Sequence, residues 1–265
     1  MIAYLSPAGA LSSEEALGGE VWRSFLALSA LHRDGWGIAS IDGRDGSGPR
    51  LAVGPGDEGT GMRIAGAAPA AGRLHYLRFA SAGSAVRAEN LQPFAADGVA
   101  FAHNGALVPR AAALDALPAA ERTRLRGDTD SEVYAAHVRL ALGAGGDPEE
   151  AVAAAVAGMR ALFPAACLNA LVLAGGELLA VHAAGTVPPP WAAFARRGAT
   201  TLPPGHDADY NVLSAAVLPS GVQAVASRGV AGDGWRPLPA DTVTRFAPGA
   251  PPRTVRIPGG QGTSR

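Results

Sequence analysis

Three observations predict an α+β fold. Strand-like segments fall into two groups, and consecutive helices lie between them without the regular strand–helix alternation of a parallel sheet. The 265 residues are 48% hydrophobic, which is enough for one large core, and the 35 glycines and 21 prolines stay below the share typical of disorder. There is no internal repeat or dividing linker. We therefore expect one domain over residues 1–247 and a loose Pro/Gly/Arg-rich tail over 248–265.

The first group of elements ends at an Asn-Gly turn signal. Strands are expected at residues 2–5, 35–41, 73–79 and 99–102. A helix is expected over residues 13–31, because Ser12 and Glu15 form a capping-box pattern ahead of apolar residues at helical spacing. The dipeptide Asn104-Gly105 is typical of a tight turn, so the fourth strand should end there.

Two helices and a second group of strands follow. One helix is expected over residues 130–142, and another starts at Asp147-Pro148, with an acidic first turn and proline at the first position. The second group of strands is expected at residues 168–174, 177–182, 210–216 and 222–226. The Gly175-Gly176 pair predicts a hairpin between the first two of these.

Composition excludes several classes of function. The formal net charge is −1, so nothing favours nucleic acid or an anionic membrane as a partner. All basic residues are arginine, which removes lysine Schiff-base chemistry and the Walker lysine. Cys167 is the single cysteine, and His32 and Asp34 have no evident third ligand, so neither a metal nor a cofactor is expected. No signal peptide or membrane-spanning run is visible, and we expect a cytoplasmic protein.

Four short motifs carry the functional signal. They are HRDGWG at 32–37, LRFASAG at 77–83, FAHNG at 101–105 and GDTDSE at 127–132. In this order and spacing they resemble class II glutamine amidotransferases, the N-terminal-nucleophile type, and above all the small single-domain γ-glutamyl-hydrolase-like members. The resemblance spans roughly residues 1 to 245. It implies a four-layer αββα sandwich.

The resemblance also implies roles for individual residues. Asn104 and Gly105 match the oxyanion hole, Arg78 the group that holds the α-carboxylate of the substrate, and Asp130 the group that holds its α-ammonium. The chemistry suits these types, because an amide and a backbone N–H stabilise an oxyanion and a guanidinium pairs bidentately with a carboxylate. Asp130 would sit in the first turn of a helix, where the helix dipole favours an ionised carboxylate.

Each of these residues also has an ordinary structural interpretation. Arg78 could form a surface ion pair, Asn104 and Gly105 could be only a turn, and Asp130 could be only a helix-start charge.

Two further residues complete the candidate substrate site. Ser81 stands where the family usually has threonine, and Trp36 is a candidate contact that is as readily explained as a core aromatic beside the pocket.

The nucleophile position departs from the family pattern. The family's nucleophile is the cysteine that follows the initiator methionine, with its own α-amino group as base. Here that residue is Ile2, whose alkyl side chain offers no nucleophile. Cys167 lies in an apolar run that reads as a buried strand, where a thiol is inert. Ser227-Arg228-Gly229 replaces the family's Ser-Glu-Pro, and this change from acid to base disfavours unmodified glutamine as the ligand.

These features lead to two hypotheses about function, beside a third in which the protein is purely structural, with a collapsed pocket and no response to ligands. The first is an amidotransferase-like pseudoenzyme without glutaminase activity that binds an amino-acid or γ-glutamyl-type ligand, or a biosynthetic partner protein. The alternative is a repurposed amidohydrolase or transferase that uses the retained oxyanion hole with water or a substrate group as nucleophile. Loss of activity on Asn104→Ala would separate the second from the first.

Overall fold

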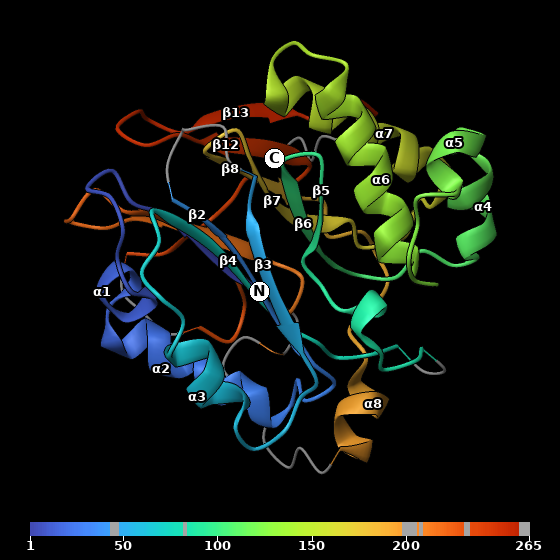
Figure 1. The fold of residues 1–265 in the computed structure, drawn as a ribbon. Coiled ribbons are helices and arrows are strands. Elements are labelled where there is room, and N and C mark those ends of the chain that lie inside the picture. Colours follow the sequence, from blue (N-terminus) through green and yellow to red (C-terminus); the bar gives the residue numbers. More distant parts are fainter. Residues whose placement is uncertain (43–47, 82–83, 198–205, 207–208, 231–233, 260–265) are drawn as a thin grey trace.

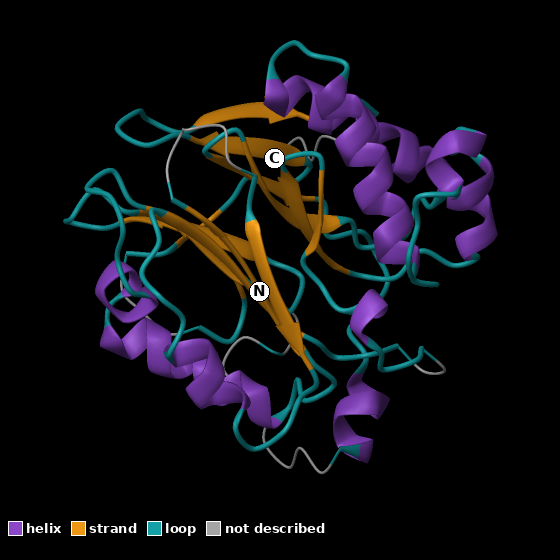
Figure 2. Cartoon of the chain, viewed as in Figure 1, coloured by secondary structure: helices purple, strands orange, loops and turns teal. Residues whose placement is uncertain are grey.

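The chain forms four layers, with two sheets packed between two sets of helices (Figures 1 and 2). The computed structural model describes residues 1–42, 48–81, 84–197, 206, 209–230 and 234–259. Both sheets are antiparallel, which confirms the predicted α+β class and the αββα sandwich. Two residues of the second motif, Ala82 and Gly83, and the last six residues of the expected tail lie outside the described residues.

The first sheet has seven strands and holds the amino-terminal strand near its middle. Its order is β11-β9-β10-β1-β4-β2-β3. The strands are β1 (Ile2–Leu5), β2 (Trp36–Ile41), β3 (Arg50–Gly54), β4 (Gly72–Leu77), β9 (Leu213–Val217), β10 (Gln223–Ser227) and β11 (Arg236–Pro237). In β1, Ile2 pairs with Ala226 on one side and with His75 on the other. The amino-terminal strand therefore lies between β4 and β10, a strand from late in the chain, in the middle of this sheet.

The second sheet has six strands in the order β13-β12-β8-β7-β6-β5. The strands are β5 (Phe94–Ala96), β6 (Val99–Asn104), β7 (Asn169–Ala174), β8 (Glu177–His182), β12 (Thr242–Phe246) and β13 (Arg253–Arg256). The β7–β8 hairpin turns at Gly175-Gly176, as its sequence predicts. Strand β6 pairs with β7 as far as Asn104 opposite Asn169, so the strand runs two residues beyond its predicted end.

The helices cover the outer faces of the two sheets (Figure 2). Those over the first sheet are α1 (Ser13–Leu17), α2 (Gly19–Ala27) and α3 (Thr60–Ala65). Those over the second are α4 (Arg110–Asp115), α5 (Ala119–Arg122), α6 (Asp130–Gly143) and α7 (Pro148–Leu162). Short 3-10 turns lie at Leu28–Ala30 and Ala88–Asn90, and α8 (Trp191–Arg196) stands apart at one end of the sandwich. None of the described helices is both long and apolar enough to cross a membrane.

Alternation along β1 decides which side chains face which core. Met1, Ala3 and Leu5 point between the sheets, whereas Ile2 and Tyr4 pack against α1 and α2. All five are buried. The side chain of Ile2 therefore belongs to the core under the helices, and its neighbour Met1 faces the other side of the sheet.

Two expectations about elements need correction. The predicted helix over residues 13–31 is broken at Gly18, whose φ of +84° fits glycine far better than other residues, so two helices form instead of one. The segment after residue 247, expected to be a loose tail, contains β13. There Thr254 pairs with Thr244 of β12, and the following Ile257 is only 2% exposed. Short alternating strands rich in Arg and Thr carry a weak apolar signal, which is why composition missed β13.

Candidate functional site

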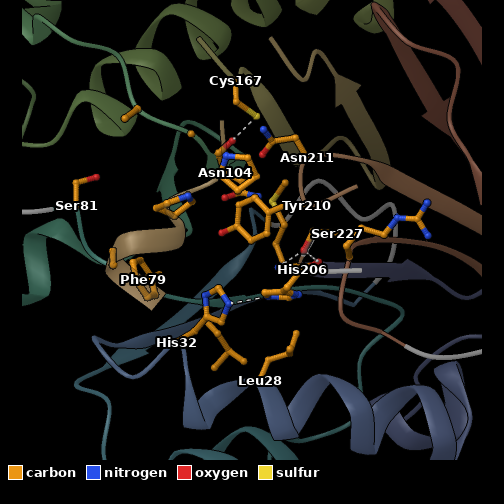
Figure 3. Close-up of a pocket in the computed structure, with 18 of the residues that line it drawn as sticks. Leu28, His32, Phe79, Ser81, Asn104, Cys167, His206, Tyr210, Asn211 and Ser227 are labelled. Carbon is orange, nitrogen blue, oxygen red and sulfur yellow. Dashed lines mark hydrogen bonds between the residues drawn. The ribbon is translucent and has the colours of Figure 1, made fainter. Parts of the chain in front are cut away.

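A cavity of about 390 Å³ opens between the two sheets, at the end where β6 finishes and β1 begins (Figure 3). Asn104, Gly105 and Cys167 line one part of it, and Tyr76 and Ser81 line another. Its walls are more apolar than polar, as is usual for small-molecule sites. Sequence motifs far apart in the chain meet here because Met1 before β1, Leu77 at the end of β4 and Asn104 at the end of β6 all line the cavity.

The turn after β6 is packed so closely that only glycine fits at position 105. A Cβ atom there would lie 2.0 Å from the Cys167 carbonyl oxygen and 2.6 Å from His103 Nε2. The thiol of Cys167 donates to the Asn104 carbonyl oxygen at 3.0 Å, which ties the turn to the chain leading into β7. This leaves the Asn104 side chain half-buried on the cavity wall. The predicted pair therefore lies together at the cavity, on a rigid support.

His103 holds the turn from behind. Its Nε2–H donates to the Cys167 carbonyl at 2.9 Å, so its Nδ1 accepts from the Ser131 hydroxyl at 3.0 Å. The backbone N–H of His103 donates to Gln92 Oε1 at 2.6 Å. Burial lowers the pKa of His103, and the carboxylate of Asp130 partly opposes that shift. The imidazole is thus neutral and fully hydrogen-bonded, consistent with a structural role.

Arg78 and Asp130 lie near Tyr76, which lines the cavity. The Arg78 guanidinium donates to Ser84 Oγ at 2.7 Å and to the Ala85 carbonyl at 3.1 Å. Asp130 Oδ2 accepts from the Leu107 N–H at 2.5 Å, just beyond the Asn104–Gly105 turn. Burial raises the pKa of Tyr76 to about 12, with Arg78 lowering it and Asp130 raising it, so both charges are close to this hydroxyl. Neither charged residue is among the described residues that line the cavity.

The remaining predicted residues divide between the cavity and the cores. Ser81 lines the cavity. Trp36 instead packs in the core under the helices, where it pairs across the sheet with Leu77, as expected of a core aromatic. The side chain of Ile2 also points into that core and is fully buried. Of the first two residues, only Met1 lines the cavity.

Met1 makes a close pair with the end of β10. Its amino group donates to Ser227 Oγ at 3.0 Å, and the Ser227 hydroxyl donates back to the Met1 carbonyl at 3.2 Å. Burial lowers the pKa of this amino group to about 5. Both residues line the cavity, so a hydroxyl and an amine face it together.

Cys167 lines the cavity but is a poor nucleophile. The residue is 6% exposed, its thiol donates to the Asn104 carbonyl, and burial raises its pKa to about 12. A thiol with that pKa is almost entirely protonated at neutral pH. The thiol supports the Asn104–Gly105 turn, and its burial agrees with the inert thiol expected from the sequence.

Two motif residues and three residues from outside the motifs form the other end of the cavity. His32, Phe79, His206 and Tyr210 line the cavity there (Figure 3). Phe194 packs against these rings and lies edge to face with Phe79 at 4.9 Å. Burial is the main cause that lowers the pKa of His32 to about 3, so its ring is neutral. The long connection between β8 and β9 brings in three of these rings, and no spacing rule predicts where such a loop folds back.

No group of three or more His, Cys, Asp or Glu side chains converges on a metal-sized site in the described parts of the chain. Asp34, considered with His32 in the sequence, instead accepts from the Ala80 N–H at 2.7 Å and pairs with Arg197. The hydrogen bond from Ala80 ties the loop after β4 to Asp34, beside the cavity.

Comparison with solved structures identifies proteins of similar fold. A glutamine aminotransferase class-II domain protein from Silicibacter pomeroyi superimposes with a TM-score of 0.62 at 20% identity, covering 97% of this chain and 98% of that one. The fold is that of class II glutamine amidotransferase domains. A predicted glutamine amidotransferase from Pseudomonas aeruginosa matches at a TM-score of 0.54 and 17% identity, over 94% of this chain and 97% of that one.

A larger enzyme contains the same domain fold. Glutamine phosphoribosylpyrophosphate amidotransferase from B. subtilis matches 98% of this chain at a TM-score of 0.60 and 15% identity. This chain spans only 49% of that enzyme. No protein-family model matches the sequence, and no curated protein matches it significantly. At these identities the likeness establishes the fold alone.

Proposed function

We propose that the cavity binds an amino-acid or γ-glutamyl-type ligand, and that this chain does not hydrolyse glutamine through a cysteine. One observation carries the proposal. The close-packed Asn104–Gly105 turn lies on the wall of a cavity of about 390 Å³, with Arg78 and Asp130 around the neighbouring Tyr76. An amide and a backbone N–H on the cavity wall, with a cation and an anion close to the adjoining Tyr76, are the groups that an amino acid bearing a γ-amide requires.

Each group has a definite part in the proposed complex. The Asn104 amide and the Gly105 N–H would donate to the γ-carbonyl oxygen of the ligand. The guanidinium of Arg78 would exchange its bond to the Ala85 carbonyl for the ligand's α-carboxylate. Asp130 keeps its contact with the Leu107 N–H through one oxygen and would offer its remaining acceptor sites to the α-ammonium.

The absence of cysteine chemistry follows from the one thiol in the sequence. Cys167 is buried and hydrogen-bonded, and its pKa is raised to about 12. The side chain at position 2, where the motif resemblance places the nucleophile, points away from the cavity into the core under the helices. The oxyanion donors would therefore hold a carbonyl without a cysteine to attack it.

Calorimetric titration with L-glutamine, together with an assay for ammonia release, tests the proposal. We expect binding without ammonia. Asp130→Asn, which keeps an acceptor for Leu107 but removes the charge, should weaken binding at least tenfold, whereas Glu14→Gln on the exposed face of α1 should not. Absence of binding would refute a ligand site. Ammonia release that is lost on Asn104→Ala would instead support the repurposed hydrolase.

A further inference from the structure

Strand β3 leaves one edge of the first sheet open. In the described part of the chain it pairs only with β2, so the N–H and C=O groups along its other side have no strand to pair with. The first three residues of the strand are exposed, and Leu51 among them is 44% exposed. Figure 1 shows β3 on the near side of the molecule, with no helix in front of it.

The other three sheet edges are protected against pairing with a further strand. Strand β11 has two residues and ends in proline, β5 has three residues, and β13 has an arginine at each end. Short strands, proline and charged side chains are the features that keep sheet edges from associating. Strand β3 has five residues, and its only charged residue is Arg50 at its start. It is therefore the sheet edge best suited to accept another strand.

The sequence around β3 is nearly the same when read in either direction. From residue 48 to residue 56 it runs Gly-Pro-Arg-Leu-Ala-Val-Gly-Pro-Gly, with Ala52 at the centre. An aliphatic residue stands on each side of Ala52, and a proline stands three residues away on each side. Only Arg50 and Gly54 break the symmetry. A segment of this kind matches a second copy of itself across a twofold axis, because each type of residue meets its like.

We infer that β3 pairs antiparallel with β3 of a second copy of this chain, centred on Ala52, so that the first sheets of two subunits form one continuous sheet. Leu51 of each copy then lies opposite Val53 of the other, and such apolar cross-strand pairs stabilise a sheet. Both side chains line a groove of about 200 Å³ between β3 and β5, which Phe94 also lines. The paired strands would cover apolar surface that the single chain leaves open.

The same register avoids conflicts of charge and of backbone hydrogen bonding. Arg50 lies opposite Gly54, so no like charges face each other across the axis. Its guanidinium keeps the ion pair that it makes with Asp42 of its own chain. A slip of one residue in either direction would place a proline in the ladder, and proline has no N–H to donate. The prolines therefore confine the pairing to the five residues of β3.

Sedimentation velocity over a range of protein concentrations tests the inference. We expect a monomer–dimer equilibrium. Leu51→Lys and Val53→Glu should each weaken the dimer by about tenfold or more, because a charge replaces one side of each apolar pair. Mixed in equal amounts, the two variants should form a heterodimer about tenfold tighter than either variant alone, since the register sets the added ammonium opposite the added carboxylate. Val217→Lys, at a 61% exposed position on β9 of the same sheet, is the matched control and should dimerise like the native chain.

Cross-linking measures the register independently. Ala52 faces its own copy across the axis, with Cα atoms about 4.5–5.5 Å apart, which is within the range that a disulfide spans. Oxidant should therefore link Ala52→Cys into a covalent dimer, and it should leave Val217→Cys and the native chain, whose one thiol is buried, unlinked. A native chain that stays monomeric at every concentration would overturn the inference. So would a dimer that Leu51→Lys does not weaken and that Ala52→Cys does not cross-link.

Discussion

At the scale of single residues, the two faces of β1 decide what position 2 can do. Ile2 is fully buried against α1 and α2, and its neighbour Met1 lines the cavity. We predict that Ile2→Cys gains no glutaminase activity, because the new thiol would lie in the core under the helices. It should lower the free energy of unfolding by about 1–3 kcal/mol through lost packing.

The measurement combines ammonia release with thermal unfolding. Ile2→Val is the matched control, since it removes one methylene and should cost about 0.5–1.5 kcal/mol. Release of ammonia from glutamine by Ile2→Cys would contradict the orientation of β1 described above.

His103 shows how a residue without a catalytic role can shape the site. Its ring fills the space that any side chain at position 105 would need, and both of its nitrogens are hydrogen-bonded. In the motif FAHNG, His103 therefore supports the turn formed by the two residues that follow it, Asn104 and Gly105. In the sequence His103 has no evident partner, because Ser131 and Cys167 lie 28 and 64 residues away.

At the scale of elements, β13 connects the carboxyl-terminal segment to the rest of the fold. It pairs with β12, Ile257 is buried, and Arg253 Nε lies 3.0 Å from Glu149 Oε1 at the start of α7. We predict that a chain ending at residue 247 is less stable by about 2–5 kcal/mol, chiefly from the buried Ile257. A chain ending at residue 259 keeps every one of these contacts and should match the full chain.

Thermal unfolding of the two shortened chains makes this comparison. The shorter chain should unfold at least about 4 °C below the full chain, given about 2–4 °C per kcal/mol for a domain of this size. Equal midpoints for both would show that β13 contributes nothing to stability.

At the scale of the whole molecule, buried neutral histidines make stability depend on pH. Burial lowers the pKa of His75, His103 and His182 below the ordinary value of 6.5. Below pH 6.5 the unfolded chain therefore binds protons that the folded chain does not. Their contribution is complete above pH 6.5 and is lost as the pH falls, by up to about 1.4 kcal/mol per pH unit for each histidine.

Urea unfolding between pH 7.5 and 5.5 should show this loss. His103→Gln should be less stable at pH 7.5, because buried partners lose their hydrogen bonds, yet its stability should fall less steeply with pH. A variant with an unchanged slope would show that His103 is not neutral in the folded state.

Some elements and site residues could be predicted from the sequence and others could not, for physical reasons. Regular apolar patterns and turn signals locate β1, β7, β8 and α6 to within a residue or two. The motifs indicate Asn104, Gly105 and Ser81 at the cavity, because these residues lie at the end of a strand or in the loop that follows one. The aromatic end could not be predicted, since it depends on how the segment after β8 folds back onto Phe79. The sequence also does not show which side of β1 the Ile2 side chain occupies, because either face of a central strand accepts isoleucine.

A crystal structure of the protein grown with L-glutamine would show directly whether the cavity binds an amino acid. We expect ligand density in the cavity, with the γ-carbonyl oxygen about 2.7–3.1 Å from the Asn104 amide and the Gly105 nitrogen. The α-carboxylate should lie on Arg78 and the α-ammonium on Asp130. Glutamine bound elsewhere, or a cavity holding only solvent at saturating glutamine, would refute the proposed binding site.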